Sequence, residues 1–127
     1  MVNTLLLVAL GGALGASLRY LWGVGLFRMI GGPLDFPVAI MTANILGSFL
    51  MGAFVVFAAQ RGATHLSPFV MTGLLGGFTT FSAFSLEAVT LIERGALGQA
   101  GVYVALSVGL SILGLIAGLW LMRTVLL

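Results

Sequence analysis

Residues 73–85 read Gly73-Leu74-Leu75-Gly76-Gly77-Phe78-Thr79-Thr80-Phe81-Ser82-Ala83-Phe84-Ser85, in the middle of an apolar segment. Three glycines and two threonines stand within the first eight of these positions, and both residue types weaken an α-helix. Irregular backbone at membrane depth is tolerated only where protein or a water-lined cavity satisfies its polar groups. The stretch therefore predicts a broken membrane helix whose free peptide groups hold an ion, with a packing-driven kink as the alternative.

The composition of the whole chain fits a lipid environment. Of its 127 residues, 61% are hydrophobic and only 6% are charged, whereas soluble domains carry roughly 25% charged residues. The apolar blocks predict four transmembrane helices in one membrane domain, residues 1–127, with spans at 3–27, 36–60, 67–92 and 97–123. We expect an all-α, multi-pass membrane protein. The first block lacks the basic start of a signal peptide, although residues 12–16 resemble a cleavage site.

The composition also argues against several classes of protein. The formal net charge of +2 comes from scattered arginines, so no nucleic-acid partner is expected. The chain has no cysteine and one histidine, which are too few for a thiolate or zinc centre. It offers no set of nucleophile, base and orienting group, so we do not expect an enzyme.

The arginines do not select an orientation in the membrane. With four spans, Arg61 and Arg123 lie on the side of the termini, and Arg28 and Arg94 lie on the other. Lys and Arg normally mark the cytoplasmic side, and here the count is two against two. Arg19 falls within the first span. We therefore expect insertion in both orientations and an antiparallel, dual-topology homodimer, because four short helices are too few to enclose a pore alone.

Small residues recur at four-residue spacing in three of the predicted spans. Such pairs let helix backbones approach closely where lipid gives no hydrophobic drive for association. We expect close helix packing at these pairs, with glycine backbone lining a permeation path as the less favoured alternative. The pairs are Gly11 and Gly15, Ala43 and Gly47, Ser48 and Gly52, and Gly114 and Gly118.

Polar and aromatic residues near the predicted break are candidates for an anion path. Phe81 and Phe84 are three residues apart on one helix face, and the edge of an aromatic ring is positive. Each polar group alone fits an interhelical hydrogen bond or a snorkelling side chain, but together they exceed what packing requires. The polar candidates are Asn44, Ser48, Thr80, Ser82, Glu87, the stripe Tyr103, Ser107 and Ser111, and the intramembrane charge Arg19.

Three stretches, residues 11–20, 44–52 and 73–87, resemble the Fluc fluoride channels, also called CrcB. The resemblance implies an antiparallel homodimer with two separate fluoride pores. It implies that Phe81 and Phe84 flank the ion, that Asn44 positions the rings and the ion, and that Arg19 lies near an aqueous vestibule.

The resemblance further implies a central, structural and non-transported Na⁺ held by backbone carbonyls of Gly76 and Thr79 from both subunits. It extends only loosely to Glu87 and to the stripe from Tyr103 to Ser111. Ala83 departs from the family pattern, which often has a hydroxyl residue there, and this leaves part of a polar track in question.

The function that the resemblance implies is passive, fluoride-selective export that lowers fluoride toxicity. The main alternative is a small proton-coupled multidrug exporter of the same four-helix, dual-topology plan. An exporter needs a carboxylate deep in its cavity, and the candidate here, Glu87, lies toward the end of the third span. A non-transporting scaffold protein would explain the glycine pairs but not the polar and aromatic cluster.

Overall fold

The computed structural model describes residues 1–32 and 34–127, and this part of the chain is helical apart from short connections. The elements are α1 (Val2–Ile30), α2 (Val38–Arg61), the 3₁₀ turn η1 (Thr64–Leu66), the π-helix η2 (Pro68–Leu75), α3 (Gly76–Phe78), α4 (Phe81–Glu93) and α5 (Leu97–Leu126). Four helical segments within the described residues are long and apolar enough to cross a membrane: Val2–Ile30, Val38–Arg61, Thr64–Glu93 and Leu97–Leu126. The predicted all-α class with four such segments is confirmed.

Glycines end the first two long helices. The caps of α1 and α2 are Gly31 (φ 94°) and Gly62 (φ 65°), both in the left-handed region that glycine adopts without steric cost. The N–H of each donates back to a carbonyl of the last turn, that of Phe27 or of Ala58. Each glycine thereby ends its helix while its N–H satisfies a carbonyl of the last turn.

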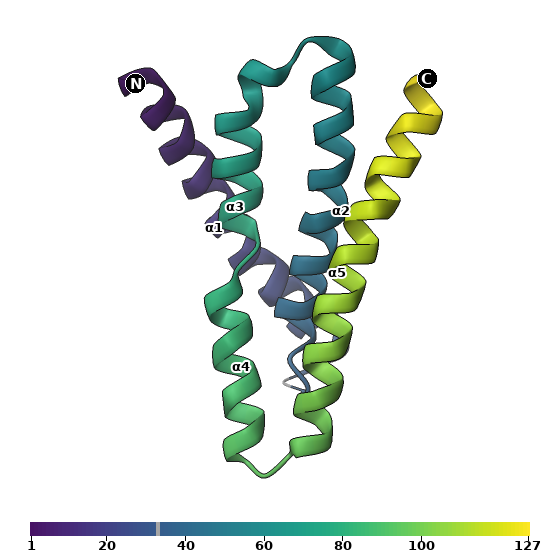
Figure 1. The fold of residues 1–127 in the computed structure, drawn as a ribbon. Coiled ribbons are helices and arrows are strands. Elements are labelled where there is room, and N and C mark those ends of the chain that lie inside the picture. Colours follow the sequence, from purple (N-terminus) through teal and green to yellow (C-terminus); the bar gives the residue numbers. More distant parts are fainter. Residues whose placement is uncertain (33) are drawn as a thin grey trace.

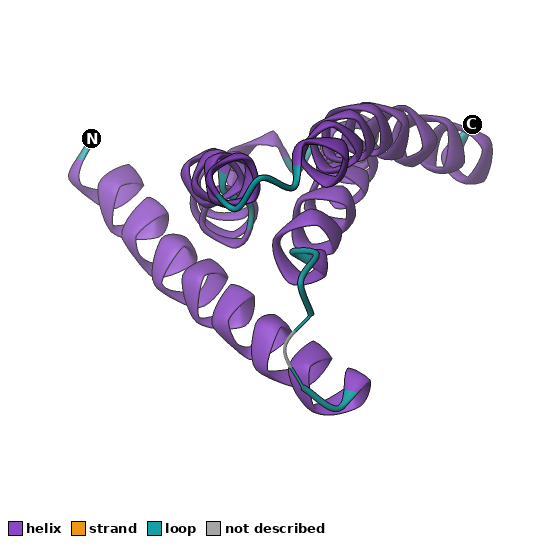
Figure 2. Cartoon of the chain, turned by 90° about the horizontal axis from the view of Figure 1, so that it is seen from below, coloured by secondary structure: helices purple, strands orange, loops and turns teal. Residues whose placement is uncertain are grey.

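The long helices form two packed pairs (Figure 1). Helix α5 runs along α2, whereas α1 crosses η2 and α3, the first half of the third segment. Seen along the bundle, α1 and α5 lie on opposite sides (Figure 2). Both termini lie at one end of the bundle, and the α4–α5 connection lies at the other (Figure 1).

Small residues make the close contacts within each pair. A Cβ added to Gly15 of α1 would collide with the carbonyl oxygen of Leu74. Between α2 and α5 the contact is reciprocal, since a Cβ on Gly52 would meet the carbonyl oxygen of Leu115, and one on Gly118 would meet that of Phe49. The packing interpretation is confirmed at these glycines.

The third segment breaks near its middle, as predicted. Thr79 (φ −89°, ψ 154°) and Thr80 (φ −154°, ψ 122°) are extended and separate α3 from α4. The π-helix η2 that precedes the break was not predicted. Its wider turns pack against α1, where a Cβ on Gly73 would lie 2.8 Å from the Cα of Gly11.

Candidate functional site

Asn44 of α2 holds the backbone of Thr80 at the break. Its Oδ1 accepts a hydrogen bond from the Thr80 N–H at 2.8 Å, and its Nδ2 donates to the Thr80 carbonyl oxygen at 3.1 Å. Thr80 in turn caps α4, because its Oγ1 accepts from the Ala83 N–H at 3.1 Å. Both peptide groups of Thr80 are therefore satisfied by a neighbouring helix, and α4 begins in a fixed position.

The carbonyl end of the first half-helix is only partly satisfied. The N–H and the Oγ1 of Thr79 both donate to the Leu75 carbonyl oxygen, each at 2.9 Å. Arg19 of α1 donates from Nε to the Gly77 carbonyl oxygen at 3.1 Å. The carbonyl oxygens of Gly76 and Thr79 accept no hydrogen bond from another described residue. They are open acceptors at a helix end, where membrane proteins bind cations.

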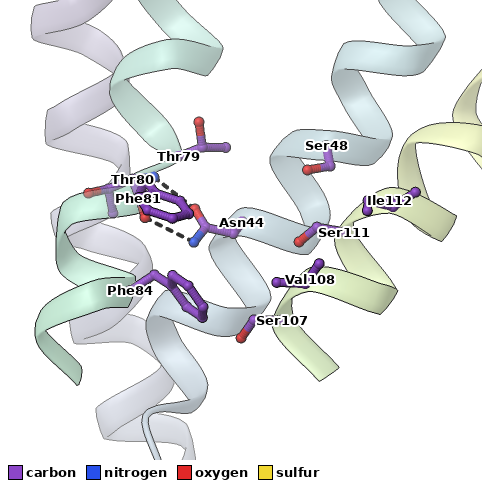
Figure 3. A pocket seen from close by; sticks show the side chains of 10 residues that line it. All are labelled: Asn44, Ser48, Thr79, Thr80, Phe81, Phe84, Ser107, Val108, Ser111 and Ile112. Atoms are coloured by element: carbon purple, nitrogen blue, oxygen red, sulfur yellow. Dashed lines mark hydrogen bonds between the residues drawn. The ribbon is translucent and has the colours of Figure 1, made fainter. Parts of the chain in front are cut away.

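A pocket of about 290 Å³ lies beside the break, between α2, α4 and α5. In Figure 3, Asn44 lies in its centre, with Phe81 and Phe84 on one side and Ser107 and Ser111 on the other. The lining residues are Asn44, Ser48, Thr79, Thr80, Phe81, Phe84, Ser107, Val108, Ser111 and Ile112. The structure thus brings together most of the residues proposed from sequence.

The two phenylalanines differ in exposure. Their ring centroids are 5.4 Å apart with an angle of 53° between the planes. Phe84 is buried and stacks on Tyr103 at 5.3 Å, whereas Phe81 is 77% exposed. In a single chain, one face of the pocket is therefore built and the other is open.

Two hydroxyl groups on α5 are buried without a partner. Tyr103 is 0% and Ser107 4% exposed, and although their two hydroxyls lie near each other, neither oxygen has a hydrogen bond of good geometry among the described residues. A buried, unsatisfied polar group is rare and costs about 1–3 kcal/mol. Because Ser107 lines the pocket, it is available to a ligand that enters there.

Other predicted residues lie outside the lining of this pocket. Ser82 is exposed, with its Oγ 3.1 Å from Thr80 Oγ1, and Tyr103 lies against the ring of Phe84. Glu87 is half-buried and does not line the pocket. Arg19 lines a separate groove of about 500 Å³ that also includes Arg28. Gly76 is exposed on the surface of the chain.

Sequence reasoning missed two apolar lining residues, Val108 and Ile112. They follow Ser107 and Ser111 by one position, so they border the hydroxyl stripe at the same four-residue spacing. That spacing is the signal that would have found them. They make one wall of the pocket apolar.

Comparisons with known proteins identify the family of this chain. Residues 6–119 match the family described as CrcB-like protein, Camphor Resistance (CrcB). A protein of Roseobacter denitrificans is 72% identical over 124 residues, covering 98% of each chain, and one of Ruegeria sp. is 68% identical over 126 residues, covering 99% of each. A protein of Cereibacter sphaeroides is 60% identical over 123 residues, covering 97% of each. All three are named "Fluoride-specific ion channel FluC". Matches of this extent show that the chain belongs to the CrcB family.

Proposed function

We propose that this protein is a passive channel that lets fluoride leave the cytoplasm across the cell inner membrane. The observation that carries the proposal is the pocket at the helix break, where hydroxyl groups of α5 face the phenyl rings of α4. The names of the similar proteins support the same ion.

Fluoride must exchange its water shell for protein donors in such a path. The unpartnered hydroxyl of Ser107 is available to donate to an anion in the pocket, and Tyr103 lies one helical turn before it in α5. Asn44 has one amide N–H left after its bonds to Thr80, since an amide nitrogen carries two. The positive ring edges of Phe81 and Phe84 complete the set.

A passive path is sufficient for export. Neutral hydrogen fluoride crosses the bilayer, dissociates in a near-neutral cytoplasm and leaves the ion trapped inside. A negative interior then drives anions outward by about 2.3 kcal/mol per charge per 100 mV. No coupled energy source is required, and export lowers fluoride toxicity.

The functional unit in this proposal is an antiparallel, dual-topology homodimer with two pores. Three observations support it: the balanced arginines, the 77% exposure of Phe81, and the long exposed apolar faces of α1 and α5. A second, inverted copy packed on these faces completes the open side of each pocket.

The proposed dimer also contains a structural Na⁺ at its centre. The open carbonyl oxygens of Gly76 and Thr79 fit this ion, because two copies bring four such oxygens to a two-fold axis. When bound, the ion supplies positive charge that balances carbonyl dipoles in a dry interface. The chain's own contribution is to keep these carbonyl groups free of competing donors.

The exporter alternative gains no support from the pocket. Proton-coupled export of a cation needs a carboxylate in the cavity, and no acidic residue lines the pocket of the described chain. Glu87 is two turns into α4, beyond Phe84. The pocket instead offers hydrogen-bond donors, which suit an anion.

Growth of bacteria that lack their own fluoride export tests the function. The wild-type chain is expected to restore growth in fluoride, and Ser107→Ala to lower the tolerated concentration about tenfold, because it removes the free donor in the pocket. The matched control is Ser17→Ala, whose exposed hydroxyl bonds only to Ala13 of its own helix. Absence of rescue by well-expressed wild type contradicts the proposed function.

Dual topology gives a separate prediction, which the absence of cysteine makes easy to measure. Gln60 at the end of α2 and Gln99 at the start of α5 are exposed and lie at opposite ends of the bundle. In intact cells, a membrane-impermeant maleimide is expected to label about half of each single-cysteine variant, Gln60→Cys or Gln99→Cys. Full labelling of one variant with none of the other contradicts dual topology.

A further inference from the structure

Arg19 reaches from α1 to the broken helix, 58 residues away in sequence. Its Nε donates to the Gly77 carbonyl oxygen at 3.1 Å, and the pair is partly buried. The two backbones are already in close contact one turn earlier, since a Cβ on Gly77 would lie 2.8 Å from the Gly12 carbonyl oxygen and 3.1 Å from the Ala16 nitrogen. The side chain therefore crosses a short, well-defined gap.

Arg19 bonds to one particular carbonyl oxygen, that of Gly77, among the carbonyl groups near the break. The Leu75 carbonyl oxygen accepts hydrogen bonds from Thr79, and the Thr80 carbonyl oxygen accepts one from Asn44. Arg19 donates to the Gly77 carbonyl oxygen, whereas the carbonyl oxygens of Gly76 and Thr79 accept no hydrogen bond from another described residue. The donors thus occupy both neighbours of the Gly76 carbonyl and one neighbour of the Thr79 carbonyl, while the Phe78 carbonyl, like those two, accepts no hydrogen bond from another described residue.

Holding the Gly77 carbonyl fixes the rotation of the half-helix end. Successive residues of a helix turn by about 100°, so a Gly77 carbonyl held toward α1 directs the Gly76 carbonyl elsewhere. Gly76 is exposed, on a surface that α1 leaves free. Without the Arg19 bond, two consecutive glycines would leave this end of the helix free to reorient.

We propose that Arg19 is a positioning residue for the break: through Nε it holds the Gly77 peptide and so presents the Gly76 and Thr79 carbonyls for Na⁺. The inference rests on the proposed function and extends it, because it assigns the sodium site a support in α1. It differs from a role as a charge that attracts anions, since the donor atom is required and the charge is not.

Three substitutions separate the donor from the charge. Glutamine carries its amide nitrogen at the chain position of arginine Nε, so Arg19→Gln keeps a donor there and removes the charge. Arg19→Lys keeps the charge but has a methylene at that position. Arg19→Met has neither donor nor charge and a similar length.

Thermal unfolding of the purified dimer is measured as Na⁺ replaces N-methylglucamine at constant ionic strength, and fluoride efflux is measured in the same series. The Na⁺ concentration for half-maximal stabilisation is expected to stay within threefold of wild type in Arg19→Gln. In Arg19→Met and Arg19→Lys it is expected to rise at least tenfold. If Arg19→Met does not fold, the glutamine and lysine variants still decide.

The reverse pattern overturns the inference in favour of a role for charge: Arg19→Lys would then keep the wild-type Na⁺ concentration for half-maximal stabilisation, and Arg19→Gln would raise it. An unchanged Na⁺ dependence in all variants overturns it as well. A wild-type protein that conducts fluoride with no Na⁺ dependence removes the sodium site and this inference together. Absence of fluoride efflux from the wild type, with its Na⁺-dependent stability intact, counts against the proposed function only.

Discussion

Replacement of Asn44 by leucine is expected to lower fluoride efflux at least a hundredfold. The side chain satisfies both the N–H and the carbonyl of Thr80, and leucine leaves both without a partner. An unsatisfied group costs about 1–3 kcal/mol when fully buried, and the two partly buried groups of Thr80 together suffice to displace the start of α4. Phe81 follows directly, so the ring pair moves with it; a hundredfold loss corresponds to about 2.7 kcal/mol.

Efflux from proteoliposomes, normalised to the amount of dimer, measures this effect. Thr42→Val is the control in the same helix, because Thr42 bonds to Trp22 and Val38 and does not line the pocket. Its efflux is expected to stay within threefold of wild type. If fluoride efflux from Asn44→Leu also stayed within threefold of wild type, the contacts of Asn44 with Thr80 would not be what positions the fluoride path.

Gly15→Ala is expected to prevent recovery of folded protein. Its Cβ would collide with the Leu74 carbonyl oxygen and lie 2.9 Å from the Phe78 nitrogen, and both are backbone atoms that cannot rotate away. Overpacking costs about 1–3 kcal/mol even where side chains can yield. Here α1 must move away from η2 and α3, so the residues that precede the break lose their packing against α1.

The yield and the size-exclusion profile in mild detergent measure this effect. Gly25→Ala is the matched control in the same helix, because a Cβ there meets nothing within 4 Å. Alanine favours helix over glycine by about 1 kcal/mol, so the control is expected to fold at least as well as wild type. A Gly15→Ala protein with the wild-type profile and thermal stability would contradict the packing account.

The break was predictable because its cause is local. Glycines and threonines in an apolar segment disfavour a helix whatever lies nearby, and the structure has extended residues at Thr79 and Thr80. The helical period also placed Ser107 and Ser111 on one face, and both line the pocket. Ser82 does not line the pocket, since it follows Phe81 and is rotated about 100° from it.

Other features depend on contacts between distant parts of the chain. Pro68–Leu75 forms a π-helix while packed on the glycines of α1, and its own residues show no signal for one. The bond from Arg19 to Gly77 joins positions 58 apart, so sequence spacing does not reveal it. Val108 and Ile112 line the pocket only because α5 lies along α2.

The most direct test of the channel is anion efflux from proteoliposomes loaded with potassium fluoride or potassium chloride, with valinomycin to carry the counter-ion. The account predicts fast fluoride release, little chloride release, and loss of the fluoride signal in Asn44→Leu. Folded dimer in Na⁺ that releases no fluoride, or releases both anions at equal rates, would contradict it.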